Sequence, residues 1–275
     1  MRIAVCDSGL GGLDIAARLY RKGGKGELFY FNVWPDPNRG FGKMTPSERK
    51  EVWEKAFDSI LTYKPDLLVI ACNTLSVVHR RSARCGSSKV KVLDIVEAAV
   101  NITGDFLKSH PEKNLLILGT AETVNSQCYK NLLVEEKGIL PSRIAGVPCP
   151  GVATAIEKDP EGAEVKELIS SFAGEAHALL GEDLSSFALG LCCTHFGYVP
   201  ELWNKYFAPH CLLNPNERIL EGTSFPGGKG EITVKMLSKI PIPESKKEAM
   251  LPFFTDSAPG IAEALKNYTY IPDLF

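Results

Sequence analysis

The chain has 275 residues, of which 44% are hydrophobic and 23% are charged, an ordinary composition for a globular protein. This length suits one large domain or two smaller ones. The net charge of −2 gives no sign of a nucleic-acid partner, and no apolar run approaches the roughly 20 residues of a membrane span. We find no secretory leader and therefore expect a cytoplasmic protein without a membrane partner.

Short apolar runs of strand length recur along the chain, separated by segments with helical signals. Most of these runs are continuous rather than alternating, which is typical of parallel strands covered on both faces. The alternation of strands and helices predicts an α/β fold with mostly parallel sheets. The expected strands are residues 2–6, 27–33, 66–72, 90–96, 114–120, 143–149, 187–193, 211–214 and 251–255.

Two of the intervening segments show helical signals in detail. Thr45 can cap a helix whose first residue is Pro46, and Glu48 completes a capping box. Between residues 160 and 180, apolar residues recur at the spacing of one helical face. These residues are Val165, Ile169, Phe172, Ala173, Ala176 and Leu180.

The order of the elements repeats between the two halves of the chain. The first half reads RIAVCDSG, ELFYFN and DLLVIACNT, and the second reads NLLILGTAET, RIAGVPCP and FALGLCCTH. In each half the third strand ends in a cysteine that a threonine soon follows. We predict two similar, pseudo-symmetric α/β domains, residues 1–95 with 212–275 and residues 96–211. Ligands bind at the carboxyl ends of parallel strands, so the active site is expected in the cleft between the domains.

Cys72 and Cys193 are each followed directly by two hydrogen-bonding residues, one of which is a threonine. A packed core has no use for such residues, so Cys72 and Cys193 are predicted to be catalytic thiols. Because side chains alternate along a strand, we expect Cys192 to face the core and Cys193 to face the site. The residues that follow the two thiols are Asn73 and Thr74 in the first half, and Thr194 and His195 in the second.

The remaining cysteines are interpreted as free, buried and structural. No C-x-x-C pair occurs, and Cys193 with His195 lacks a second ligand pair at the spacing of a zinc site. We therefore predict no metal. The cysteines interpreted in this way are Cys6, Cys85, Cys128, Cys149 and Cys211.

The segment CDSGLGGLD, residues 6–14, places three glycines where a strand turns into a helix. Its order matches neither the dinucleotide fingerprint nor the P-loop, so a nucleotide site is only the alternative interpretation. We favour a tight turn whose helical N–H groups face a carboxylate. Asp7 and Ser8 then lie at the level of the thiols, unless one of them merely caps the helix.

Seven motifs occur in order along nearly the whole chain: DSGLGG, ACNT, IVEAAV, GTAETVNSQCY, CPGVATAIE, CCTHFGYVPEL and FFTD. In this order and spacing they resemble the motifs of the glutamate racemases, within the aspartate/glutamate racemase superfamily. An ordered set of this kind is far more specific than any single motif.

This resemblance implies that the chain interconverts L- and D-glutamate without a cofactor, to supply a precursor of cell-wall peptidoglycan. It implies two α/β domains with the active site between them, and Cys72 and Cys193 as the catalytic pair. Glu157 matches a carboxylate near the second thiol. The residues implied to bind the amino acid or to tune the thiols are Asp7, Ser8, Asn73, Thr74, Thr194 and His195.

Racemisation itself explains the need for two thiols. A single base would return the proton to the face of Cα from which it came, so two opposed acid/base groups are required. One is a thiolate while the other is a thiol, and they exchange roles with each turnover. The resemblance implies that Cys72 deprotonates the D-enantiomer and Cys193 the L-enantiomer. We also expect a homodimer with a small amino acid as substrate.

One loop departs from the family pattern. Where the family carries Pro-Tyr-Gly, this chain has Gly40, Phe41 and Gly42, so a phenolic hydroxyl is lost. We expect Phe41 and the backbone of Gly42 still to contact the substrate. The preceding segment is longer than in the family, and Trp34 and Asp36 are candidates to enter the site.

The loop keeps two alternatives open. Loss of one polar partner can reduce discrimination by orders of magnitude, so the substrate can be another small amino or carboxylic acid, such as aspartate. The other alternative is a catalytically inactive, ligand-binding relative. Proton exchange at Cα in heavy water distinguishes this relative from an enzyme. A decarboxylase is disfavoured, because protonation at one face requires only one thiol.

Overall fold

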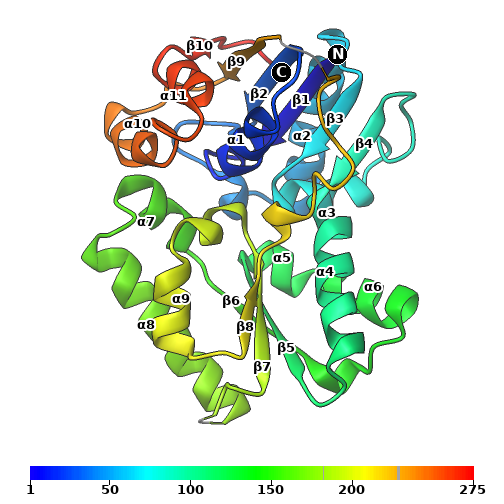
Figure 1. The fold of residues 1–275 in the computed structure, drawn as a ribbon, viewed down its shortest axis with the longest axis vertical. Coiled ribbons are helices and arrows are strands. Elements are labelled where there is room, and N and C mark those ends of the chain that lie inside the picture. Colours follow the sequence, from blue (N-terminus) through cyan, green and yellow to red (C-terminus); the bar gives the residue numbers. More distant parts are fainter. Residues whose placement is uncertain (182, 228–229) are drawn as a thin grey trace. The chain divides into compact units, whose positions relative to one another are not determined.

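Ten strands form two separate parallel sheets in the computed structural model, which describes residues 1–181, 183–227 and 230–275 (Figure 1). The chain divides into two compact units. The first unit comprises Met1–Ile95 with Ile219–Phe275, and the second comprises Val96–Arg218. The α/β class with parallel sheets, expected from the apolar runs, is confirmed.

The sheet of the first unit has the strand order β10-β9-β2-β1-β3-β4, and every neighbouring pair is parallel. The central strands β1, β2 and β3 are mostly buried, as in sheets that helices cover on both faces, whereas the edge strands β4 and β10 are partly or fully exposed. The bounds of the strands are β1 Arg2–Asp7, β2 Gly26–Asn32, β3 Leu67–Ile70, β4 Lys91–Asp94, β9 Ile232–Ser238 and β10 Thr269–Tyr270.

The helices of the first unit follow the expected signals. α2 begins at Pro46 with the predicted capping box: the Thr45 side chain accepts the backbone N–H of Glu48, whose carboxylate accepts the N–H of Thr45. α2 and α3 bury Trp53, Phe57 and Leu75 among the apolar side chains of the sheet. The helices are α1 Leu13–Arg21, α2 Pro46–Thr62, α3 Asn73–Arg80, α10 Glu244–Met250 and α11 Pro259–Lys266.

The sheet of the second unit has the order β6-β5-β7-β8, again with parallel neighbours. α7, α8 and α9 contribute to one apolar core with alternate residues of β5, β6 and β7. The predicted apolar face of α8 is confirmed, with Val165, Ile169 and Phe172 all buried. The strands are β5 Asn114–Gly119, β6 Ile144–Pro148, β7 Phe187–Cys192 and β8 Cys211–Leu213. The helices are α4 Ile95–Ser109, α5 Ala121–Asn125, α6 Cys128–Lys137, α7 Val152–Lys158, α8 Ala163–Leu180 and α9 Pro200–Phe207.

The two units share one strand order, which is the structural form of the sequence repeat. β2-β1-β3-β4 in the first unit corresponds to β6-β5-β7-β8 in the second. In sheets of this order the connections diverge between the first and third strands, and the carboxyl ends there form the usual binding position. Cys72 follows β3 and Cys193 follows β7, so each thiol occupies this position in its own unit.

One expected strand is wrong, and two observed strands, β9 and β10, were not expected. Residues 251–255 are not a strand, because Leu251–Phe253 forms a 3-10 turn directly after α10. Pro252 lacks the N–H that a strand ladder requires, but it suits the first turn of a helix. The strand beside β2 is β9, whose full register runs from Gly26 opposite Ile232 to Asn32 opposite Ser238. Polar residues interrupt its apolar run, which concealed it.

The second unit ends later along the chain than expected. We predicted a return to the first domain at residue 212, but β8 pairs with β7, with Leu213 opposite Gly190. The side-chain amide of Asn216 also donates to the carbonyl of Thr194 in the same unit, at 3.1 Å. The chain therefore re-enters the first unit at Ile219.

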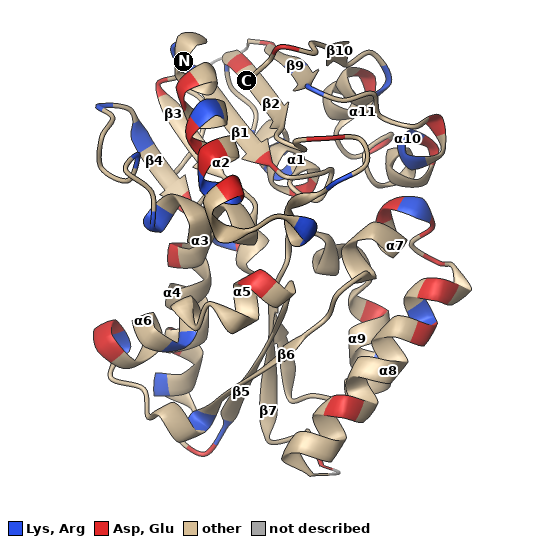
Figure 2. Cartoon of the chain, turned by 180° about the vertical axis from the view of Figure 1, so that it is seen from behind, with Lys and Arg blue, Asp and Glu red and all other residues tan. Residues whose placement is uncertain are grey.

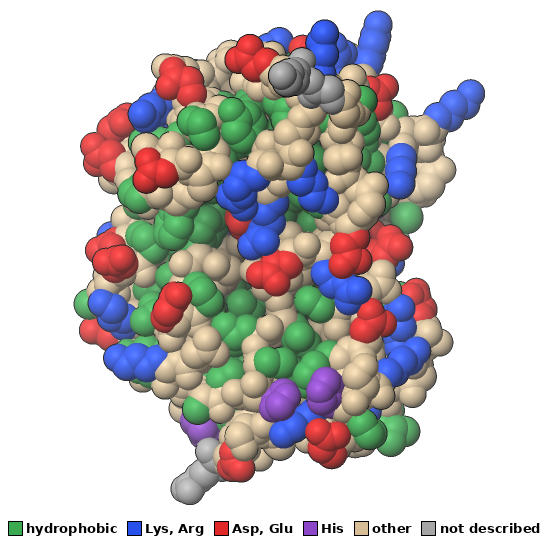
Figure 3. Space-filling model, in the orientation of Figure 1, with side chains coloured by type: hydrophobic (Ala, Val, Ile, Leu, Met, Phe, Trp, Pro, Cys, Tyr) green, Lys and Arg blue, Asp and Glu red, His purple; other side chains and the backbone are tan. Residues whose placement is uncertain are grey.

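Charges of both signs are interspersed on the surface of each unit. Along α2, basic and acidic side chains alternate, and Lys55 pairs with Glu51 at 2.7 Å (Figure 2). Apolar, polar and charged atoms are likewise mixed on the face shown in Figure 3. Within the described residues, no helix is both long and apolar enough to cross a membrane.

Candidate active site

The first thiol lies at the carboxyl end of the first sheet. Asp7 ends β1, Ser8 follows it, and Cys72 lies just beyond β3, the parallel neighbour of β1. Asp7 and Cys72 are 1% and 6% exposed. The hydroxyl oxygen of Ser8 lies 3.1 Å from the Cys72 sulfur. Adjacent parallel strands thus bring together residues that are more than sixty positions apart in the sequence.

Cys72 is also the N-cap of α3. The backbone N–H of Leu75 points to its sulfur, with the nitrogen 3.5 Å away. Asn73 and Thr74 form the first turn of this helix, and both are buried beside the thiol. The amino end of a helix carries partial positive charge, so this position stabilises negative charge on the sulfur.

Burial dominates the protonation of this thiol. Burial, together with the nearby charge of Asp7, raises the pKa of Cys72 to about 12. Hydrogen bonds from Ser8 and Leu75 act in the opposite direction but are weaker. Without a ligand, Cys72 is therefore a protonated thiol at neutral pH and is ready to donate a proton.

The glycine-rich segment after β1 allows close packing. A Cβ on Gly12 would lie 2.8 Å from the Cβ of Asp7 and 2.9 Å from the Cβ of Ala71. Only glycine lets α1 approach the strand ends this closely. Gly12 is also the N-cap of α1 and has no side chain with which to cap it.

The second thiol occupies the corresponding place in the second unit. Cys193 follows β7, and Thr194 and His195 begin a 3-10 turn, Thr194–Tyr198. The Cys193 sulfur lies 3.8 Å from Nδ1 of His195. Nε2 of the same imidazole lies 2.8 Å from the carboxylate of Glu157, in α7. Thiol, imidazole and carboxylate thus form a buried chain of contacts.

The imidazole in this chain is kept protonated. Burial alone would lower the pKa of His195, but its contacts with Cys193 and Glu157 outweigh burial and hold the pKa well above the usual value. His195 and Glu157 are both buried, so solvent screens their interaction weakly. A cationic imidazole beside the sulfur stabilises negative charge on Cys193.

Further residues hold the second loop in place, and the sequence analysis did not identify them. Phe196 packs on Trp203 with ring centroids 4.7 Å apart, and the Trp203 indole donates to the Phe196 carbonyl. The side-chain amide of Asn216, near the end of this unit in the sequence, donates a hydrogen bond to the Thr194 carbonyl. Thr120 directly follows β5, whose last residue, Gly119, lies opposite Cys192. The GTAET motif, which contains Thr120, was the sequence feature that could have indicated this position.

The neighbouring Cys192 is fully buried within the second unit. Burial, and next the proximity of Cys193, raise the pKa of the Cys192 thiol, while a hydrogen bond with Tyr129 acts against this rise. All eight cysteines are free. Cys6 and Cys149 are buried as expected, but Cys85 is exposed, and Cys128 and Cys211 are partly exposed.

We expect Cys192→Ala to cost about 1 kcal/mol of stability, because it removes one buried sulfur atom, and to leave turnover within about twofold of wild type. Urea unfolding measures the first quantity, and racemisation rates in both directions measure the second. If substrate protects Cys192 rather than Cys193 from a thiol reagent, then Cys192 is the thiol that faces the active site.

The loop that contains Gly40, Phe41 and Gly42 is shaped by packing against Trp34. Phe41 is buried in the core of the first unit at 4% exposure, whereas Gly42 is exposed, with no atom near the place of a Cβ. A Cβ on Gly40 would lie 2.4 Å from the Trp34 ring. The indole N–H of Trp34 donates to the carbonyl of Asp36, so these two residues bond within the loop.

A consequence concerns the proline that the family pattern places at position 40. We expect Gly40→Pro to destabilise the protein by about 1–3 kcal/mol, because the ring carbons would overlap the indole of Trp34. In a Trp34→Ala background the same change is expected to cost much less. Thermal unfolding of the two single variants and the double variant measures this coupling. Additive effects would contradict the proposed clash.

No cluster of three or more His, Cys, Asp or Glu side chains with the geometry to hold a metal ion occurs among the described residues. In each unit the candidate site instead consists of one thiol with one or two partners. Such groups donate and accept protons.

Known proteins resemble this chain in both sequence and fold. It is 25% identical over 256 residues to the glutamate racemase of Clostridium perfringens, covering 92% of this chain and 89% of that relative. It is 27% identical over 220 residues to the glutamate racemase of Helicobacter pylori strain G27, covering 78% and 79%. No model of a protein family matches the chain.

The fold resembles that of the glutamate racemase of Francisella tularensis, whose crystal structure contains D-glutamate. The TM-score is 0.75 at 19% identity, covering 98% of this chain and 97% of that structure. The matches in sequence and in fold each span most of the chain. The chain therefore resembles the glutamate racemases in sequence over most of its length, and it shares their fold.

Proposed function

We propose that this protein interconverts L- and D-glutamate by a two-base mechanism in which Cys72 and Cys193 act without a cofactor. The observation that carries this proposal is the equivalent position of the two thiols. Each follows the third strand of a sheet with the same order, beside a polar side chain that contacts its sulfur. The names of the relatives support glutamate as the substrate.

In the proposed reaction, a thiolate removes the proton from Cα while the opposed thiol donates its proton to the other face. In the L-to-D direction, the Cys193 sulfur takes the proton and Cys72 supplies one. The product leaves Cys193 as a thiol and Cys72 as a thiolate, ready for the D-to-L direction. Both acid and base are side chains of this chain, so the step requires no bound cofactor.

The unequal surroundings of the two thiols support this assignment. Burial and Asp7 keep Cys72 protonated, whereas the imidazolium of His195 lies beside Cys193. The ligand-free enzyme is thus prepared to act on the L-enantiomer first. In the reverse direction, Ser8 and the amino end of α3 stabilise the Cys72 thiolate.

The polar groups at the two strand ends are proposed to hold the substrate between the thiols. Hydroxyls of Ser8, Thr74 and Thr194 are suited to its carboxylates, and the carboxylate of Asp7 to its ammonium group. Asn73 and the exposed backbone of Gly42 add further donors. A single site formed by both units is part of this proposal.

The test is a panel of single enantiomers of glutamate, aspartate and other small amino acids, incubated with purified protein in D2O and followed by chiral chromatography. We expect racemisation of glutamate from either enantiomer, with deuterium incorporated at Cα. Exchange without inversion would contradict the two-base mechanism. The absence of both exchange and inversion for every acid would indicate an inactive, ligand-binding relative.

A second candidate is racemisation of another small acid, such as aspartate. The observation that favours it is the loop of Gly40, Phe41 and Gly42, where Trp34 fills the space that a proline would need. The ring of Phe41 carries no hydroxyl and is buried. In the same panel, a higher kcat/KM for aspartate than for glutamate would select this candidate.

The biological setting is proposed along with the reaction. We propose that the enzyme acts in the cytoplasm and supplies D-glutamate for cell-wall peptidoglycan. The homodimer expected from the sequence stays a prediction, which sedimentation analysis of the purified protein will measure.

A further inference from the structure

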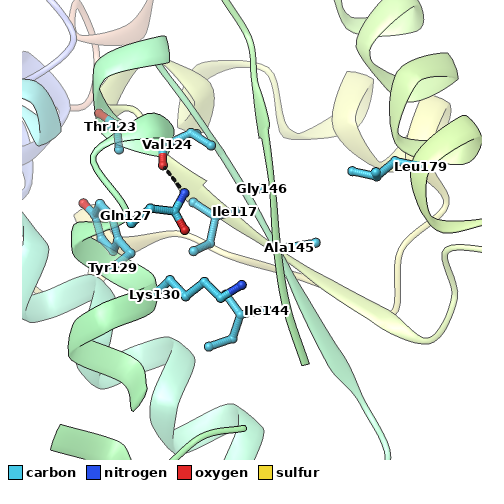
Figure 4. A pocket seen from close by; sticks show the side chains of 10 residues that line it. All are labelled: Ile117, Thr123, Val124, Gln127, Tyr129, Lys130, Ile144, Ala145, Gly146 and Leu179. Carbon is cyan, nitrogen blue, oxygen red and sulfur yellow. Dashed lines mark hydrogen bonds between the residues drawn. The ribbon is translucent and has the colours of Figure 1, made fainter. Parts of the chain in front are cut away.

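A cavity of about 180 Å³ lies in the second unit, at the edge strand β6 (Figure 4). Ile117 of β5 and Ile144 of β6 form part of its wall, together with Val124 of α5 and Gln127, which lies between α5 and α6. Leu179 lines it from α8. None of its lining residues belongs to the proposed catalytic machinery.

The charge of this cavity has one sign. No acidic residue lines it, and Lys130 is its only charged residue. Within the described part of the chain, the Lys130 ammonium makes no hydrogen bond or salt bridge. Figure 4 shows this side chain extending along the cavity towards Ile144. Lys130 is partly buried, so an anion in the cavity would pair with its ammonium in place of water.

The start of α6 adds to this preference. Gln127 is the N-cap of the ten-residue helix α6, makes no side-chain cap, and is followed by no acidic residue in the first turn. The partial positive charge of the helix end therefore lies at the same cavity. Gln127 adopts a left-handed backbone with φ of 56°, and its amide donates to the Val124 carbonyl, which folds the side chain over the cavity.

The walls and the volume limit the ligand. Ile117, Val124, Ile144 and Leu179 offer apolar contacts that suit an apolar ligand body, beside the polar side chains of Thr123, Gln127 and Tyr129. An apolar cavity of roughly 150 Å³ accommodates one benzene molecule, and this cavity is similar in size. An amino acid with two carboxylates and an ammonium group fits poorly, because the lining residues offer its ammonium no carboxylate.

We propose that this cavity binds a small monocarboxylate whose apolar body is a single ring or a branched chain, with the carboxylate paired to Lys130. The site is separate from the proposed racemase chemistry. It lies on the central and amino-terminal parts of β5 and β6, whereas Cys193 follows the carboxyl end of β7.

The experiment uses the full-length protein with 13C-labelled isoleucine methyl groups and two probes, phenylacetate and 4-methylpentanoate. We expect each probe to shift the methyl signals of Ile117 and Ile144 in a saturable manner. Lys130→Met is expected to weaken binding about tenfold, because a charged hydrogen bond is lost. Lys166→Met, which removes an exposed lysine of α8, is the matched control and should leave binding unchanged.

Phenylacetamide, the neutral analogue, separates charge from shape. It should bind the wild-type protein about as weakly as phenylacetate binds Lys130→Met, and the variant should not discriminate between the two compounds. Lys130→Gln serves as a second variant if the methionine change alters the unfolding temperature. Equal affinity of the wild type and both Lys130 variants would overturn the proposal. So would a lack of shifts at Ile117 and Ile144 with both probes. No readout depends on racemase activity, so failure here is distinct from failure of the proposed function.

Discussion

Alanine in place of either Cys72 or Cys193 is expected to lower racemisation in both directions by about 10²–10⁴-fold, the usual contribution of one general acid/base. The loss should appear in both directions for each variant, because every turnover needs one thiolate and one thiol. Circular dichroism of each enantiomer over time measures the two rates.

The control for this experiment is Cys85→Ala, which removes an exposed cysteine of the first unit. It should retain full activity, and all three variants should keep the far-UV spectrum of the wild type. Near-normal turnover of Cys72→Ala or Cys193→Ala in both directions would refute the two-base mechanism.

The second large effect is expected at Glu157. We predict that Glu157→Gln lowers kcat by about 10²-fold, because the amide cannot hold the His195 imidazole in its cationic form. In the wild-type protein, burial alone would lower the pKa of His195, but its contacts with Cys193 and Glu157 outweigh burial and raise this pKa. In the proposed mechanism, Glu157 therefore acts through His195, as a positioning residue.

The direction of the pH effect follows from this raised pKa. In the wild-type protein the imidazolium persists above the ordinary histidine pKa of about 6.5 and is lost as pH rises through the higher value. Without the Glu157 carboxylate, burial lowers the pKa and the imidazolium is lost at lower pH. On the alkaline side of the pH–activity profile, Glu157→Gln should therefore lose activity at a lower pH than the wild-type protein does.

The pair of His195 and Glu157 also contributes to stability, and this contribution, like the activity, is lost as pH rises. Its contribution is complete below the pKa of the unfolded histidine and disappears as pH rises through the raised pKa of the folded state. Glu164→Gln is the matched control, since Glu164 forms an exposed pair with Lys158 in the same unit. It should change neither the pH profile nor kcat. An unshifted profile for Glu157→Gln would contradict the proposed role.

The sequence by itself determined the α/β class, the repeat of the two halves and the motifs around both thiols. These features are local: a continuous apolar run, a capping box or a cysteine before a helix is visible in a few neighbouring residues. The repeat also placed Cys72 and Cys193 after equivalent strands, which the shared strand order of the two sheets then explained physically.

Only the tertiary structure decided which residues approach one another across the chain. The contact of His195 with Glu157, the hold of Asn216 on Thr194 and the pairing of β9 with β2 each join distant segments. The sequence assigned no structural partner to Trp34, yet its ring occupies the space that a side chain on Gly40 would need. Such contacts depend on how strands and helices pack, because close-packed interiors leave no room for an added carbon, and a linear pattern does not record that packing.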